Sequence, residues 1–139
     1  MDLFNYSRRE TSVVHVGNVE VGGSNPVRVQ SMTNTATQDT EACVEQAKRI
    51  IDAGADYVRL TTQGIKEAEN LRNINAELRK QGYLNPLVAD VHFTPKVADV
   101  AALYAEKVRI NPGNYLDAPR TFKQVDYTDE EYAVELQKI

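Results

Sequence analysis

Charged and polar residues alternate with apolar ones at the ends of two short segments in the second half of the chain. Asp90 and His92 alternate in this way in the segment VADVH, and Arg109 and Asn111 do so in KVRIN. Side chains two residues apart on a strand lie on the same face, so each pair projects in one direction. An unpaired buried charge is costly, which makes an arginine on an inner strand face a candidate for ligand binding.

Two earlier segments repeat this pattern. Gln30 shares a side with Met32, and Arg59 shares a side with Thr61. If the strands are parallel, the four polar sets meet at the rim formed by the carboxyl ends, where barrel enzymes hold their active sites.

Arg59 and Arg109 suit an anionic ligand at this rim. A guanidinium donates in a fork that matches two oxygens of a phosphate. Asn111 and Thr61 stand beside the two arginines in the predicted strand order. We therefore expect a phosphate-bearing ligand between Arg59 and Arg109.

The loop Ser31–Thr35 adds hydroxyl and amide groups after the first strand. Such groups can surround a phosphate, although an ordinary solvated loop has the same composition. On this basis Gln30, Ser31 and Asn34 join Arg59 and Arg109 as candidate ligand-binding residues.

Two other interpretations of the charged residues remain open. Arg59 and Arg109 can form internal salt bridges with Asp90, which does not exclude ligand binding. Asp90 and His92 can act as an acid–base pair or as metal ligands, but a metal needs a third ligand from elsewhere.

Strands and helices alternate along the chain, which predicts an α/β fold with a parallel sheet. A β-hairpin is expected at 13–21, with a turn at Gly17-Asn18 and an exposed His15.

The predicted domains are an N-terminal segment, 1–26, and four βα units, 27–139. The four units form the N-terminal half of a TIM (β/α)8 barrel with the hairpin beneath it. An open doubly wound sheet is the alternative, but its glycine-rich turn is absent. The expected strands are 27–32, 57–62, 87–91 and 107–110, and the expected helices are 41–53, 65–80, 95–104 and 128–139, with 114–125 irregular.

Composition restricts the class of protein. The chain has 139 residues, a formal net charge of −4 and no apolar run near the length of a membrane span. This argues against nucleic-acid binding and favours a cytoplasmic protein without a membrane segment. The single cysteine, Cys43, lies on the apolar face of a predicted helix, so we expect it in the core.

Four segments together closely resemble the 4-hydroxy-3-methylbut-2-enyl diphosphate synthase (GcpE) family. They occur in order between about Thr11 and Asn114. The segments are VQSMTNT (29–35), GADYVR (54–59), ADVHF (89–93) and VRINPGN (108–114).

The resemblance implies an iron–sulfur oxidoreductase of the methylerythritol phosphate (MEP) route to isoprenoids. Enzymes of this family open 2-C-methyl-D-erythritol 2,4-cyclodiphosphate reductively, with two electrons from ferredoxin or flavodoxin. A [4Fe–4S] cluster, held by three cysteines and a glutamate in a C-terminal domain, delivers the electrons. By resemblance Arg59, Arg109 and Asn111 hold the cyclic diphosphate, while Asp90 and His92 line the pocket as candidate catalytic residues, Asp90 in proton handling.

The chain also departs from this family. Its one cysteine cannot supply a cluster, so the iron–sulfur domain is expected outside this segment, and the chain alone is expected to be inactive. Exposed edge strands favour association, and a homodimer is expected. The alternatives are a pterin-binding barrel of the dihydropteroate synthase kind, and a noncatalytic interaction domain whose arginines pair with Asp90.

Overall fold

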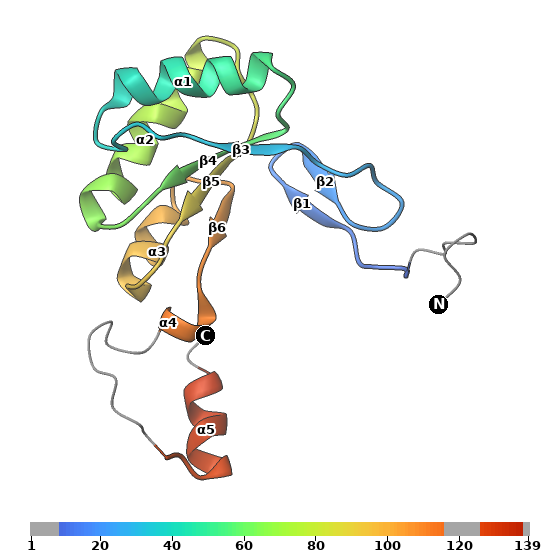
Figure 1. Ribbon diagram of the computed structural model, residues 1–139, viewed down its shortest axis with the longest axis vertical. Coiled ribbons are helices and arrows are strands. Elements are labelled where there is room, and N and C mark those ends of the chain that lie inside the picture. The colour runs from blue at the N-terminus through green and yellow to red at the C-terminus, as the bar shows by residue number, and fades with distance from the viewer. Residues whose placement is uncertain (1–8, 116–125, 138–139) are drawn as a thin grey trace.

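The computed structural model describes residues 9–115 and 126–137 (Figure 1). Its strands are β1 Val14–Val16, β2 Val19–Val21, β3 Gln30–Met32, β4 Tyr57–Thr61, β5 Leu87–Asp90 and β6 Lys107–Arg109. Its helices are α1 Thr40–Asp52, α2 Ile65–Lys80, α3 Pro95–Ala101, α4 Pro112–Tyr115 and α5 Asp129–Leu136.

Strands β3 to β6 form a parallel sheet in sequential order, and β1 and β2 form a separate antiparallel hairpin. Helix α1 connects β3 to β4, α2 connects β4 to β5, and α3 connects β5 to β6. A helix between successive parallel neighbours is the arrangement that the alternating sequence pattern predicts. The predicted α/β class, parallel sheet and N-terminal hairpin are therefore confirmed.

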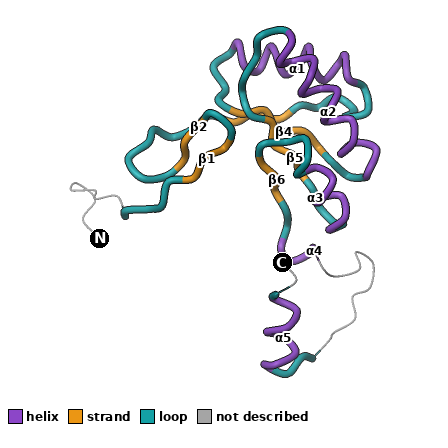
Figure 2. Tube along the Cα trace, turned by 180° about the vertical axis from the view of Figure 1, so that it is seen from behind, coloured by secondary structure: helices purple, strands orange, loops and turns teal. Residues whose placement is uncertain are grey.

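The core lies between the sheet and helices α1 to α3 (Figures 1 and 2). Alternate strand residues such as Val58, Leu60 and Ala89 face this core and are fully buried. The helices contribute fully buried apolar residues at helical spacing, among them Leu71 and Ile74. Because this outer face is apolar, the charged residues of the strands occupy the opposite face, which we call the inner face.

Cys43 is one of the fully buried core residues, as the helical pattern predicted. Burial raises the pKa of its thiol, and a contact of 3.1 Å with the Thr35 hydroxyl opposes that effect in part. The thiol also donates to the carbonyl of Ala36. Cys43 therefore acts as a small core residue.

The hairpin packs against the inner face at the amino ends of the strands. Val16 forms a small buried cluster with Tyr57 and Val88, and Val19 and Val21 flank it. Gly17 adopts a φ of 56°, which the tight turn requires. The hairpin therefore covers the lower part of the inner face, as expected for a plug beneath a barrel. His15 is exposed, as predicted.

Helix boundaries follow the predicted signals with three exceptions. Asp39 caps α1 by accepting from the amide of Ala42 at 3.0 Å, and Gly54 follows the end of α1 with a φ of 99°. Prediction was wrong at Asn114 and Tyr115, which belong to the single turn of α4, and at the ends of α3 and α5, which stop at Ala101 and Leu136. The predicted irregular stretch beyond Tyr115 lies largely outside the described residues.

Glu106 joins three elements at the end of the sheet opposite the rim. Its carboxylate accepts from Arg79 at 2.8 Å, from Asn75 at 3.2 Å and from the backbone amide of Leu87 at 2.8 Å. Burial raises the pKa of Glu106, but the hydrogen bonds to its carboxylate, led by that from Leu87, together outweigh burial and leave its pKa below the ordinary value. Glu106 thereby fixes α2 and the start of β5 to the segment that leads into β6.

We predict that Glu106→Gln lowers the free energy of unfolding by about 1–3 kcal/mol, because Arg79 loses its charged partner. Urea unfolding near pH 7 measures the change. The control is Glu69→Gln, which changes an exposed glutamate on α2, the helix that carries Arg79.

The pH dependence of stability supplies the second part of this test. Because the folded protein lowers the pKa of Glu106, its contribution is present above the unfolded value of about 4.5 and is lost as the pH falls through the folded value. The stability difference between the two proteins should therefore shrink below about pH 4.5. A difference that stays constant or grows with acidification would contradict this assignment.

Candidate functional site

Asp90 lies between two arginines at the carboxyl end of the sheet. Its Oδ2 accepts from Arg59 Nη2 at 2.6 Å, and its Oδ1 accepts from Arg109 Nη1 at 3.1 Å. Asp90 is 1% exposed, whereas the two arginine side chains are 26% and 38% exposed. A buried carboxylate thus anchors two guanidinium groups that solvent and ligands can reach.

The strand register explains why Asp90 lies close to both arginines. Asp90 is paired with Thr61 on β4 and with Arg109 on β6, so the three side chains share the inner face at one level. Arg59 is paired with Val88, two residues before Asp90. The alternation of polar and apolar residues along the sequence therefore predicted correctly that Arg59, Asp90 and Arg109 lie on the same face of the sheet.

His92 and Asn111 follow the ends of β5 and β6. His92 Nδ1 lies 3.9 Å from Asp90 Oδ1 and is buried without a hydrogen-bond partner among the described residues. The His92 ring also lies 5.7 Å from that of Phe93. Asn111 is half-buried between Arg109 and the first turn of α4. His92 therefore lies two residues beyond Asp90 in the chain, and Asn111 lies two residues beyond Arg109.

The charges in this cluster do not cancel. Two guanidinium groups face one carboxylate, and each reaches it through a single terminal nitrogen. The remaining N–H groups include Arg59 Nε, which is buried and has no partner within the described part of the chain. An anion is the ligand that such a surplus of donors and positive charge suits.

A polar hollow of about 620 Å³ adjoins Thr61. The loops after β3 and β4 line it with the hydroxyl and amide residues Thr35, Gln38 and Gln63, and with Glu67 of α2. Gln38 donates to Glu67 at 2.5 Å, and this hydrogen bond lowers the pKa of the glutamate. Sequence reasoning did not single out Gln63 or Glu67, because no motif marks them and only the fold brings them to Thr61.

Asn34 belongs to this hollow and is fixed by α1. Its side-chain oxygen accepts from Gln46 Nε2 at 2.8 Å, and its backbone amide donates to Gln46 Oε1 at 3.0 Å. The structure therefore places Asn34 in the hollow that adjoins Thr61 and holds its amide group against α1.

Gln30 and Ser31 do not join the arginines. Gln30 is on the inner face, but its register partner is Tyr57, at the level of the hairpin. Ser31 is paired with Val58, a helix-facing core residue, and lines a groove with Gln46 and Ile50 of α1. Successive side chains alternate between faces, so Ser31 cannot share the face of Arg59. Their expected convergence at the rim is not observed.

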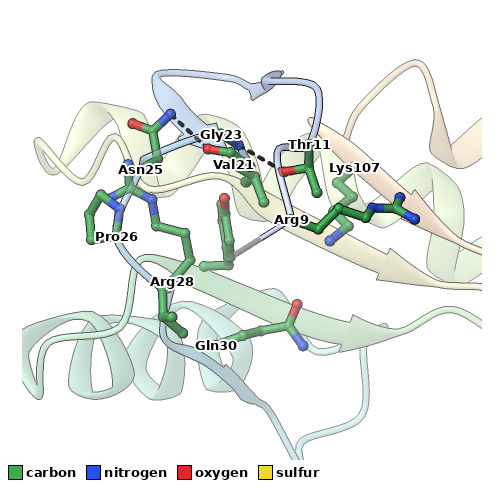
Figure 3. Close-up of a pocket in the computed structure, with 12 residues that line it drawn as sticks. Arg9, Thr11, Val21, Gly23, Asn25, Pro26, Arg28, Gln30 and Lys107 are labelled. Atoms are coloured by element: carbon green, nitrogen blue, oxygen red, sulfur yellow. Dashed lines mark hydrogen bonds between the residues drawn. The ribbon is translucent and has the colours of Figure 1, made fainter. Parts of the chain in front are cut away.

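A second hollow, of about 610 Å³, lies beside the hairpin (Figure 3). Arg9, Arg28 and Lys107 line it together with Tyr57. Arg28 is already paired with Asp56 at 3.6 Å, and Lys107 lies 5.7 Å above the ring of Tyr57. The hydroxyl of Tyr57 is buried without a partner in the described residues. This hollow is at the opposite end of the inner face from Asp90.

The residues present do not fit an iron–sulfur cluster. Such clusters need several thiolates, and Cys43 is enclosed in the core. Across residues 9–115 and 126–137, no group of three or more histidine, cysteine, aspartate or glutamate side chains is suitably placed for a metal ion. In the same ranges, none of the helices has the length and apolar character that crossing a bilayer requires.

The parallel strand–helix units, the hairpin below them and the charged site at the carboxyl rim define a protein of the (β/α)-barrel class. Within that class the chain belongs to the GcpE family, because the family model for the GcpE TIM-barrel domain matches residues 11–135. The resemblance of the four sequence segments is thereby confirmed.

Curated relatives carry the name 4-hydroxy-3-methylbut-2-en-1-yl diphosphate synthase (flavodoxin). Relatives from Bacteroides thetaiotaomicron and Bacteroides fragilis YCH46 are each 78% identical over all 139 residues of this chain. One from Parabacteroides distasonis is 58% identical over the same length. The chain spans 23%, 22% and 23% of these three relatives.

We predict that Tyr57→Phe leaves the free energy of unfolding unchanged or raises it by up to about 1–3 kcal/mol, because a buried hydroxyl without a partner costs free energy. Thermal and urea unfolding measure the effect. Tyr83→Phe serves as the control, since Tyr83 donates a hydrogen bond to Asp52 at 3.3 Å. Destabilisation by more than about 1 kcal/mol in Tyr57→Phe would show that the hydroxyl has a partner.

Proposed function

We propose that this chain is the substrate-binding part of a 4-hydroxy-3-methylbut-2-enyl diphosphate synthase. Its proposed ligand is 2-C-methyl-D-erythritol 2,4-cyclodiphosphate, which the synthase opens reductively at a ring C–O bond with two electrons. The observation that carries the proposal is the pair of arginines fixed by Asp90 at the carboxyl rim. The names of the relatives support the choice of this diphosphate over other anions.

In this proposal Arg59 and Arg109 bind the diphosphate through the N–H groups that Asp90 does not use. Asn111 and His92 line the same pocket, and Asn34 lies at its edge with Thr61. The resemblance suggested Asp90 for proton handling, but we now take His92 as the candidate for proton transfer, because its buried Nδ1 has no partner among the described residues. Gln30 and Ser31 drop out of the proposed contacts, since their register places them elsewhere.

Electron supply comes from outside this chain in our proposal. Flavodoxin is the proposed donor, because the relatives' names include it. The [4Fe–4S] cluster of the family is assigned to other residues of the synthase, since Cys43 is buried in the core. The proposed location of the reaction is the cytoplasm.

The titration that tests this function uses the cyclic diphosphate and isothermal calorimetry. We predict that Arg59→Ala and Arg109→Ala each weaken binding about 10- to 100-fold, because each removes a charge-assisted contact worth about 1.5–3 kcal/mol. Arg72→Ala, an exposed arginine on α2 with the same change in charge, should bind like the unmodified chain.

A noncatalytic domain is the second candidate, and one observation favours it: both arginines pair internally with Asp90. It predicts no saturable binding of the cyclic diphosphate at millimolar concentration. A parallel titration with a pterin diphosphate tests the dihydropteroate synthase alternative, and preference for the pterin would overturn our proposal.

We also propose that the chain associates with a second copy. All three residues of β3 are exposed, and β3 and β6 each have one strand neighbour in the described sheet. Such edges pair readily with other chains. Light scattering across a concentration series should therefore give a mass above 15.6 kDa, whereas a monomer at every concentration would contradict this expectation.

A further inference from the structure

Asp90 is unusual among the polar residues at the rim because it is enclosed while its partners are not. It is 1% exposed, and each of its two oxygens accepts from a different arginine. A carboxylate in this position presents almost no surface to a ligand. Its accessible effect is therefore on the geometry of Arg59 and Arg109.

The register shows how large that effect is. Arg109 is level with Asp90, but Arg59 is level with Val88. Two residues along a strand correspond to about 6.6 Å. The side chain of Arg59 must therefore extend toward the rim to place Nη2 2.6 Å from Asp90 Oδ2. Asp90 thus brings two guanidinium groups that start from different levels to the two oxygens of one carboxylate.

Proton transfer by Asp90 is difficult to combine with this arrangement. A proton on Oδ1 or Oδ2 would neutralise the carboxylate and turn an O–H group toward a guanidinium donor, so both arginines would lose their charged partner. His92 does not have this conflict, because its Nδ1 is 3.9 Å from Asp90 and has no hydrogen-bond partner in the described residues. Proton transfer is therefore compatible with the surroundings of His92 but not with the two ion pairs of Asp90.

We propose that Asp90 is a positioning residue, which holds the guanidinium groups of Arg59 and Arg109 on its two oxygens so that both can bind the phosphoryl groups of a cyclic diphosphate. This inference rests on the proposed function, which supplies the ligand. It further assigns selectivity to Asp90: a rigid pair of guanidinium groups favours the constrained cyclic diphosphate over flexible inorganic diphosphate, because less conformational freedom is lost on binding.

The variant Asp90→Asn separates positioning from simple electrostatics. It removes a negative charge beside the anion site, so electrostatics alone would tighten binding of both diphosphates. Positioning predicts the opposite for the cyclic ligand: its affinity falls at least tenfold, while inorganic diphosphate binds as before or more tightly. Asp99→Asn, an exposed residue on α3 with the same change in charge, is the control and should change neither affinity.

Nitrogen-15 NMR of the arginine side chains tests the positioning directly and needs no ligand. In the unmodified chain, the guanidinium signals of Arg59 and Arg109 should show restricted rotation and slow hydrogen exchange. Arg59→Lys and Arg109→Lys assign these signals, and Asp90→Asn should abolish the restriction. Freely rotating guanidinium groups in the unmodified chain would overturn the inference even if Asp90→Asn fails to fold.

The outcomes also distinguish this inference from the proposed function. If the arginine variants lose binding and Asp90→Asn keeps the same preference for the cyclic ligand, the inference is overturned and the proposed function stands. If the unmodified chain shows restricted arginines but does not bind the cyclic diphosphate, the proposed function fails, and with it the assigned selectivity.

Discussion

The charged rim depends on one buried carboxylate that two arginines share. Removing a single partner from a buried ion pair leaves an uncompensated charge, which is far more costly than any surface contact. The inner face can carry Arg59 and Arg109 because β5 places Asp90 between them. The apolar outer face and its helices set the strand order, and that order puts the three charges together.

The opposite end of the sheet uses the same physical principle for a different purpose. Glu106 is also a carboxylate with several donors, but those donors come from α2 and the backbone of β5, so it stabilises the fold. The hairpin packs against the inner face near this end of the sheet. The proposed ligand site and the structural support thus lie at opposite ends of the strands, as in barrel proteins, where the carboxyl end carries the function.

Sequence pattern predicted the sheet, most helix boundaries and the face that carries Arg59, Asp90 and Arg109, because strand periodicity and capping are local. It failed at two residues of β3 for different reasons: register places Gln30 at the level of Tyr57, and the alternation of side chains places Ser31 on the helix-facing side. Register depends on the packing of the whole strand, which three or four residues do not reveal. Glu106 was missed because its partners are 19 to 31 residues away in the chain.

The most direct test of the central claim is a crystal structure of this chain with the cyclic diphosphate. We predict phosphate oxygens within hydrogen-bond distance of both Arg59 and Arg109, with both ion pairs to Asp90 intact. Density for the ligand only in the hollow beside the hairpin, near Arg9 and Lys107 (Figure 3), would contradict the account. So would a bound ligand that displaces the arginines from Asp90.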